Sequence, residues 1–201
     1  MLHGATQAKL AFICNVVIDS EKEIIYAVAG DPHKAHRQGC DFLLERCKVS
    51  AEGADIVIVS NGGYPLDQNV YQAVKGMSAA ALLVRKNGVI IMIAASEDGV
   101  GAPEFYKTFA EERDLGRLQA AILQTPREKT RVDQWQSQVL ARVLDHCRVV
   151  YLSEMPAEII ELLHMVPAST PEAALAEADR LHGDSGGSII ASPDGISVVI
   201  E

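Results

Sequence analysis

The chain has 201 residues, of which 48% are apolar, enough for one large domain or two small ones with a substantial buried core. Its formal net charge of −9 argues against binding to the phosphate backbone of nucleic acids, which requires a basic surface. No apolar run approaches the roughly 20 residues that span a bilayer, and no secretion signal is visible, so we expect a cytoplasmic protein that binds neither nucleic acid nor membrane.

The first part of the chain predicts a hairpin followed by a helix. Residues 10–18 and 23–29 are apolar runs typical of strands, and the polar patch between them indicates a turn. A helix should then begin at Pro32, because Asp31 is a favourable N-cap and Pro32 suits the first helical position. We expect this helix to run to about Val49.

The rest of the chain alternates between strands and helices. The near-continuous apolar runs at 54–59, 88–95 and 148–152 are typical of strands covered on both faces. A last strand is predicted over residues 195–200. Helices are predicted at about 67–77, 103–110, 115–123, 130–146 and 156–163, and a last one begins with Thr170 as N-cap and Pro171 at its first position.

This alternation predicts an α/β fold: a layered, mixed but mostly parallel sheet flanked by helices, with the opening hairpin as its antiparallel portion. The chain shows no repeat, low-complexity tract or Pro/Gly-rich linker. We therefore predict a single domain over residues 1–201.

Ligands of open α/β sheets bind beyond the carboxyl ends of the strands. Two of these ends carry glycine-rich loops, at residues 61–68 and 96–102. Glycine allows a tight turn and a close approach of the backbone to a ligand. Each loop is equally consistent with a simple strand-to-helix connection.

The helix after the first loop presents a polar face. At about 100° per residue, Tyr71, Gln72 and Lys75 lie roughly opposite its apolar residues. Lys75 could meet a carboxylate through a charge-assisted hydrogen bond, and Gln72 could bond a hydroxyl or a carbonyl. From spacing alone, a solvated helix face is the favoured interpretation.

Trp135 is the single tryptophan of the chain, with valines near it at helical spacing. Taken alone, it is better explained as an anchor in the core or at a partner contact than as a ligand contact.

The run Asn61-Gly62-Gly63-Tyr64-Pro65-Leu66-Asp67-Gln68-Asn69, followed by Tyr71-Gln72-Ala73-Val74-Lys75-Gly76, resembles the C-terminal domain of the nickel-dependent lactate racemase family. The resemblance covers nearly the whole chain. Its shorter matching pieces are Ala29-Gly30-Asp31-Pro32 with His36-Arg37, Gly88-Val89-Ile90-Ile91, Asp98-Gly99, Glu104-Phe105-Tyr106 and Asp133-Gln134-Trp135.

The resemblance implies the C-terminal, substrate-side domain of a two-domain racemase or epimerase of 2-hydroxy acids. In that family a nickel-pincer nucleotide, tethered to a lysine of the N-terminal domain, takes hydride from the α-carbon of the substrate, while histidines of that domain act as acid and base. The cofactor-bearing lysine and these histidines have no counterparts here. We therefore expect no catalytic residue in this chain, no activity from the chain alone, and an active site between the two domains.

The resemblance also assigns substrate and active-site contacts to a tyrosine, a glutamine, a lysine and a tryptophan. The matching positions are Tyr71, Gln72, Lys75 and Trp135. We expect Lys75 and Gln72 to bind the substrate, and Tyr71 and Trp135 to shape the cleft.

Two alternatives remain. A stand-alone module that binds a small carboxylate or docks to a partner would need no catalytic half. A serine hydrolase is suggested only by Ser185 within Gly183-Asp184-Ser185-Gly186-Gly187, and the alternation of helix and strand does not fit the β-barrels that carry this motif.

Overall fold

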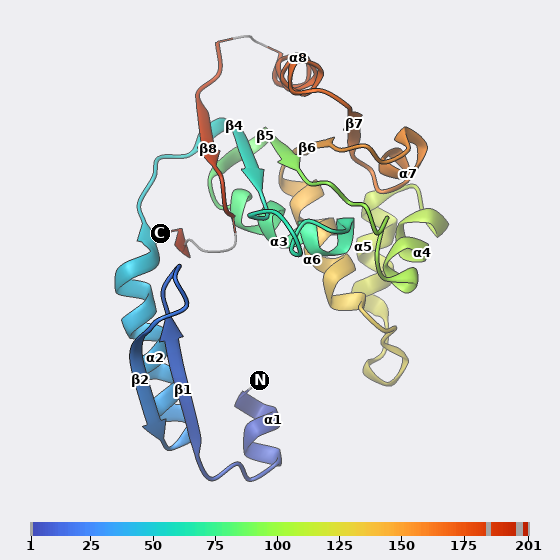
Figure 1. Cartoon of the computed structure of the whole chain (residues 1–201). Helices are drawn as coiled ribbons and strands as arrows, with labels where there is room; N and C mark the ends of the chain where they lie inside the picture. Colours follow the sequence, from blue (N-terminus) through green and yellow to red (C-terminus); the bar gives the residue numbers. More distant parts are fainter. Residues whose placement is uncertain (1, 184–185, 196–198, 201) are drawn as a thin grey trace. The chain divides into compact units, whose positions relative to one another are not determined.

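The computed structural model describes residues 2–183, 186–195 and 199–200. Contacts divide the chain into two compact units, Met1–Val49 and Ser50–Ile200, and each is described by itself (Figure 1). The single domain predicted for residues 1–201 stays a prediction.

The first unit contains the predicted hairpin and helix. Its elements are α1 (Leu2–Gln7), β1 (Ile13–Ile18), β2 (Ile24–Gly30), α2 (Pro32–Cys47) and β3 (Lys48–Val49). The strands β1 and β2 pair antiparallel, as predicted, but they form a two-stranded sheet of their own instead of the antiparallel portion of a mixed sheet. Asp31 caps α2 as expected, because its carboxylate accepts hydrogen bonds from the backbone amides of His33 at 3.1 Å and Lys34 at 3.0 Å.

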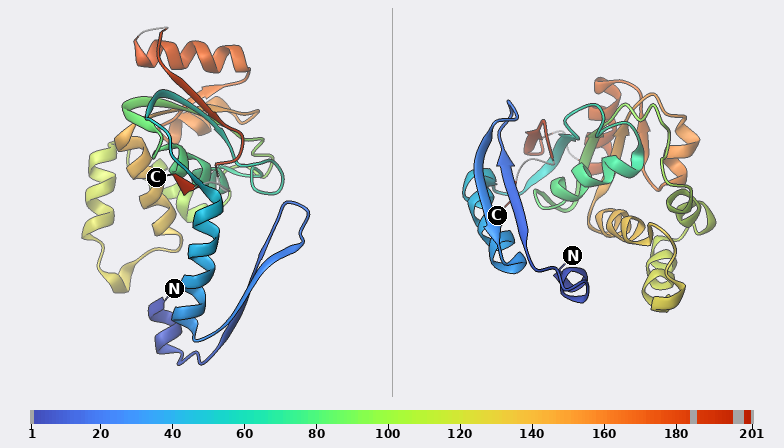
Figure 2. Two further views of the ribbon diagram at one scale, coloured as in Figure 1. Left: turned by 90° about the vertical axis from the view of Figure 1, so that its left-hand side faces the viewer. Right: turned by 60° about the horizontal axis from the view of Figure 1, so that its bottom comes forward.

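One face of the hairpin packs on α2 (Figure 2). The other face carries exposed apolar side chains. On the packed face, the ring of Tyr26 stacks on that of Phe42 with centroids 4.0 Å apart. Side chains alternate along a strand, so the residues next to those that face α2 point the opposite way. Val16 and Ile18 lie there, about half exposed at 51% and 52%.

The second unit is built on a five-stranded parallel sheet in the order β7-β6-β5-β4-β8, and this confirms the predicted α/β class. The bounds are β4 (Ala54–Ser60), β5 (Val84–Ile93), β6 (Arg148–Leu152), β7 (Val166–Ala168) and β8 (Ile189–Ser192). The bounds of β6 agree with the prediction, whereas β5 begins earlier, and the short edge strands β7 and β8 were not predicted. Of the strand predicted over residues 195–200, the structure describes β9 (Val199–Ile200).

Helices cover both faces of this sheet, with α8 on the opposite side from α3 and α6 (Figure 1). The bounds are α3 (Val70–Ala80), α4 (Pro103–Glu111), α5 (Leu115–Gln124), η1 (Arg127–Lys129), α6 (Gln134–His146), α7 (Ala157–Leu162) and α8 (Pro171–His182). On one face Val57, Ile90 and Tyr151 belong to the main core with α3 and α6. On the other, Ile56, Val89 and Val150 pack with the alanines of α8.

Two helix boundaries differ from the prediction for local reasons. The helix expected from residue 130 begins at Gln134, because Asp133 has a left-handed backbone with φ 60° that cannot continue a helix. The helix expected from Asp67 begins at Val70, because Asn69 acts as its N-cap. Among the described residues, none of the helices has the length and apolar character needed to cross a membrane.

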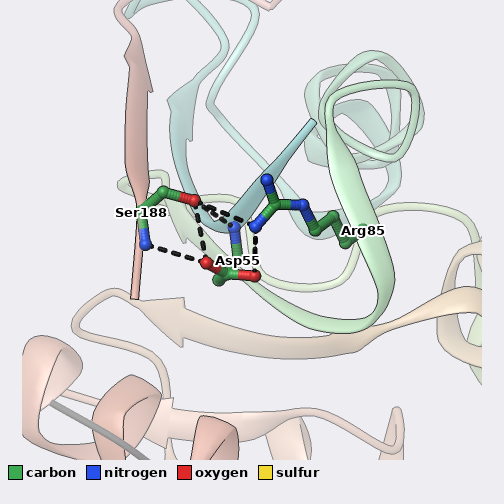
Figure 3. A network of polar contacts seen from close by, with 3 residues as sticks. All are labelled: Asp55, Arg85 and Ser188. Atoms are coloured by element: carbon green, nitrogen blue, oxygen red, sulfur yellow. Dashed lines mark hydrogen bonds and ion pairs between the residues drawn. The ribbon is translucent and has the colours of Figure 1, made fainter. Parts of the chain in front are cut away.

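The amino end of β4 carries a polar network that joins three strands or strand ends (Figure 3). The carboxylate of Asp55 accepts hydrogen bonds from Arg85 at 2.7 Å, from the amide of Ser188 at 2.9 Å and from the Ser188 hydroxyl at 2.8 Å. Ser188 directly precedes β8. The network therefore fastens the edge strand β8 and the start of β5 to β4.

Candidate functional site

The two glycine-rich loops lie side by side at the carboxyl ends of β4 and β5. Four backbone hydrogen bonds join the segment 67–71 to the segment 96–100. Their donors and acceptors are Ser96 N to Asp67 O at 2.9 Å, Asp98 N to Gln68 O at 2.8 Å, Val70 N to Gly99 O at 3.1 Å and Tyr71 N to Val100 O at 3.0 Å. The second loop thus holds the first turn of α3 in place.

The buried side chain of Asn61 fixes the polar part of α3 from the other side. Its amide nitrogen donates to the carbonyl oxygen of Gln72 at 2.7 Å, and its amide oxygen accepts from the backbone amide of Gly76 at 3.0 Å. Gln72 and Gly76 are one helical turn apart, so Asn61 bonds to both ends of the segment that carries Gln72 and Lys75. The sequence offered one signal for this residue, its place between a strand end and two glycines.

Gln72 and Lys75 are in direct contact on the accessible face of α3. The Lys75 ammonium donates to the side-chain oxygen of Gln72 over 2.6 Å. This bond fixes the orientation of the amide, because an ammonium has no acceptor. The amide NH₂ of Gln72 and the remaining protons of Lys75 are therefore the groups that this pair can offer to a ligand, and both are donors suited to an anion.

Tyr71 is half-buried where α3 meets α4 and α6. Its hydroxyl donates to Oδ1 of Asp133 at 2.9 Å, and its backbone carbonyl accepts from the side-chain amide of Gln136 at 2.6 Å. Its ring packs edge to face with that of Phe105. Burial, and then the hydrogen bond and negative charge of Asp133, raise the pKa of Tyr71 to about 12. The residue is therefore a neutral phenol at physiological pH.

Trp135 lies beside Tyr71, and the two rings meet edge to face with centroids 6.2 Å apart. The indole is 57% exposed, so of the two anchors that its spacing favoured, in the core or at a partner contact, the structure contradicts the first. The structure thus brings the predicted residues together: Tyr71 and Lys75 are one turn apart on α3, Gln72 bonds to Lys75, and Trp135 contacts Tyr71. Asp133 and Asn61 were not among them.

A neighbouring cavity of about 460 Å³ lies along the second glycine loop, between Ser96–Val100 and residues 154–159. The predicted site residues are not among its lining residues. Beneath it, the buried hydroxyl of Tyr151 shares a 2.6 Å hydrogen bond with that of Ser96.

The described residues contain no group of three His, Cys, Asp or Glu side chains placed to hold a metal ion. Ser185, on which the hydrolase hypothesis depends, lies outside the described residues together with Asp184.

Comparison with known proteins places the chain in a family. The sequence profile described as "Lactate racemase C-terminal domain" matches residues 49–200, which nearly coincide with the second compact unit. The whole chain aligns with curated lactate racemases of Lactiplantibacillus plantarum, at 43% identity, and Thermoanaerobacterium thermosaccharolyticum, at 44%. It covers 47% of each of these relatives, so it spans about half of their length.

Solved structures agree with the sequence matches. The lactate racemase apoprotein from T. thermosaccharolyticum superposes over the whole chain with a TM-score of 0.94 at 43% identity, and the chain covers 48% of it. A protein from Thermotoga maritima shares the fold over 94% of the chain and 49% of its own, with a TM-score of 0.55 at 14% identity. From the profile match and the sequence identity, the chain belongs to the lactate racemase C-terminal domain family.

Proposed function

We propose that this chain is the substrate-side half of a nickel-pincer-dependent racemase or epimerase of lactate-type 2-hydroxy acids. In this proposal Gln72 and Lys75 bind the substrate, and Tyr71 and Trp135 form the adjoining wall of an active site shared with a preceding half. The observation that carries the proposal is the Lys75–Gln72 pair, two donors in contact over 2.6 Å on an accessible helix face at the carboxyl ends of the strands.

The chemistry of this pair suits a carboxylate. A carboxylate has two acceptor oxygens, and Lys75 and Gln72 offer it an ammonium and an amide donor side by side. Exposed ion pairs contribute little to the free energy of binding because water screens them. Lys75 therefore binds a small acid with useful affinity only where solvent is excluded from the pair. A second domain that closes over α3 would cover the pair and exclude water.

The cofactor belongs, in this proposal, to the half of the relatives that lies outside this chain. The donors at the site suit an anion rather than a nickel ion, and the described residues offer no ligand set for a metal. The cofactor would supply hydride transfer at the α-carbon. This chain would orient the acid, and alone it would not racemise it.

The apolar face of the β1–β2 hairpin supports the presence of that preceding half. The matched family model is that of a C-terminal domain, and the chain covers 47% of the L. plantarum relative, so we infer that the remaining sequence of the relatives lies before the aligned region. Large apolar side chains exposed together on one face commonly mark an interface. We therefore assign the preceding half as the occupant of the hairpin face around Val16 and Ile18.

The test is Lys75→Ala in the chain joined to the preceding half of its relatives. We expect the dissociation constant for lactate to rise by about 30-fold, or about 2 kcal/mol, because the substrate carboxylate loses a charged partner in a closed site. Lys86→Ala is the matched control, since Lys86 is an exposed lysine on β5. Equal affinity of the two variants for lactate would remove Lys75 from the site.

A binding measurement on the 201-residue chain separates the alternative of a stand-alone module. The proposal predicts no racemisation and only weak, non-saturating binding of lactate by the chain alone, because the exposed pair is screened by water. Saturable binding at low millimolar lactate, abolished by Lys75→Ala, would favour the stand-alone module.

A further inference from the structure

Tyr71 has a single hydroxyl proton, and that proton is already used. It is donated to Oδ1 of Asp133 at 2.9 Å. Asp133 comes directly before α6 and two residues before Trp135, and its left-handed backbone, with φ 60°, is a conformation that few residues other than glycine adopt. The hydrogen bond therefore links α3 to the start of α6, where Trp135 lies.

This contact changes what Tyr71 can offer to a ligand. A tyrosine hydroxyl has one proton, so a phenol that donates to Asp133 has no second proton for a substrate carboxylate. Burial and the Asp133 carboxylate both raise the pKa of Tyr71, so the phenol keeps this proton at physiological pH. Donors for an acid then come only from Gln72 and Lys75 among these neighbours on α3.

The same contact sets the position of the indole. Trp135 is 57% exposed, and its indole meets the Tyr71 ring edge to face, so the position of Tyr71 bears directly on that of the indole. The side-chain amide of Gln136, the residue that follows Trp135 in the sequence, donates to the backbone carbonyl of Tyr71 at 2.6 Å. Asp133 and Gln136, which flank Trp135 in the sequence, thus both form hydrogen bonds with Tyr71.

We propose that Asp133 is a positioning residue of the site: by accepting the hydrogen bond of the Tyr71 hydroxyl it holds the Tyr71–Trp135 wall beside the Lys75–Gln72 pair and leaves the substrate carboxylate to that pair alone. This inference rests on the proposed function for its consequence in substrate binding. The link between Asp133 and Trp135 is independent of it and can be tested separately.

The first test uses the 201-residue chain, in which Trp135 is the only tryptophan and so reports on its own surroundings. We expect Asp133→Ala and Tyr71→Phe each to shift the emission maximum of Trp135 and to change its quenching by acrylamide at least 1.5-fold. The double variant should show no more change than either single one, because both remove the same bond. Asp133→Asn, whose side-chain oxygen still accepts, should match the original chain.

Asp145→Ala is the matched control, since Asp145 is an exposed carboxylate on the same helix. Far-UV circular dichroism identifies variants that fail to fold, and Tyr71→Phe still tests the link if Asp133→Ala is one of them. Additive effects in the double variant, or emission unchanged in both single variants, would overturn the positioning role.

The second test uses the chain joined to the preceding half of its relatives. We expect Asp133→Ala to raise KM for lactate about fivefold or more with a smaller change in kcat, and Asp133→Asn to restore KM to within about twofold. Tyr71→Phe should raise KM less than Lys75→Ala, because the phenol donates nothing to the substrate carboxylate. A larger effect of Tyr71→Phe than of Lys75→Ala would overturn that division of donors. A fluorescence change without any change in KM would uphold the Asp133 contact and count against the proposed function.

Discussion

Gly76 lies within α3, where alanine would ordinarily stabilise the helix by up to about 1 kcal/mol. At this position a Cβ would lie 2.5 Å from the side-chain oxygen of Asn61 and 3.2 Å from the carbonyl of Ser60. Asn61 is buried and bonded at both ends of its amide, so it cannot move aside without losing hydrogen bonds. The glycine thus permits the close approach by which Asn61 fixes the helix.

We therefore expect Gly76→Ala to lower the free energy of unfolding by about 1–3 kcal/mol, because overpacking outweighs the gain in helix propensity. Urea unfolding followed by circular dichroism measures the change. Gly39→Ala in α2 is the control, since its Cβ would make an ordinary 3.6 Å contact with Val28 and should cost nothing. A Gly76→Ala chain as stable as the original would show that Asn61 yields.

Among the elements, β8 is attached to the sheet by side chains as well as by its backbone pairing with β4. Among the described residues this short strand has one partner in the sheet, β4, and the Asp55–Arg85–Ser188 network lies at its start (Figure 3). The Arg85 guanidinium, followed by the amide and hydroxyl of Ser188, holds the pKa of the Asp55 carboxyl well below its usual range. The charged carboxylate is therefore the form that the folded state favours.

This preference predicts a defined pH dependence. Because the folded-state pKa of Asp55 is depressed, its contribution to stability is present above the unfolded-state pKa of about 3.9 and is lost as pH falls below that value. We expect Asp55→Asn to melt at a lower temperature than the original chain from pH 5 to 7, with the gap narrowing below about pH 4. Thermal unfolding across this range measures it.

Asp145→Asn, which changes an exposed carboxylate on α6, serves as the reference for the general effect of removing a charge. A gap between Asp55→Asn and the original chain that is the same at pH 3 and pH 7 would contradict the assignment. In that case the hydrogen bonds of the network would stabilise the fold without a contribution from the charge of Asp55.

At the scale of the whole molecule, the two units differ in how much apolar surface they bury. The strands of the second unit are covered by helices on both faces, whereas the hairpin of the first leaves Val16, Ile18, Ile24 and Ile25 between 46% and 63% exposed. A hairpin on a single helix buries little, so its stability should depend on further contacts. The preceding half of the relatives is the partner that we propose for them.

Val16→Glu tests this partner. In the 201-residue chain the change should be nearly neutral, because the side chain is already half exposed. In the chain joined to the preceding half it should cost more than about 2 kcal/mol, because an unpaired charge would be buried. Differential scanning calorimetry of both forms measures the contrast. Glu21→Lys, at the exposed hairpin turn, is the control. Equal effects of Val16→Glu on the stability of both forms would show that the preceding half does not cover this face of the hairpin.

The sequence by itself determined the elements whose signals lie in consecutive residues. The Asp31 and Thr170 caps, the hairpin and the bounds of β6 all follow from local hydrogen-bonding chemistry and apolar periodicity. Helical spacing also placed Tyr71, Gln72 and Lys75 on one polar face, and the family resemblance singled out these residues and Trp135.

Only the tertiary structure decided which distant residues meet. The bond from Tyr71 to Asp133 joins residues 62 apart, and the bond that fastens β8 joins Asp55 to a residue 133 positions away. Local sequence patterns are weak at Asp133, with its left-handed backbone, and in the edge strands β7 and β8. These features are stabilised by packing across the fold and not by residues adjacent in the sequence. For that physical reason the sequence indicated the donors of the site, whereas the contacts that hold them emerged only once the chain was folded.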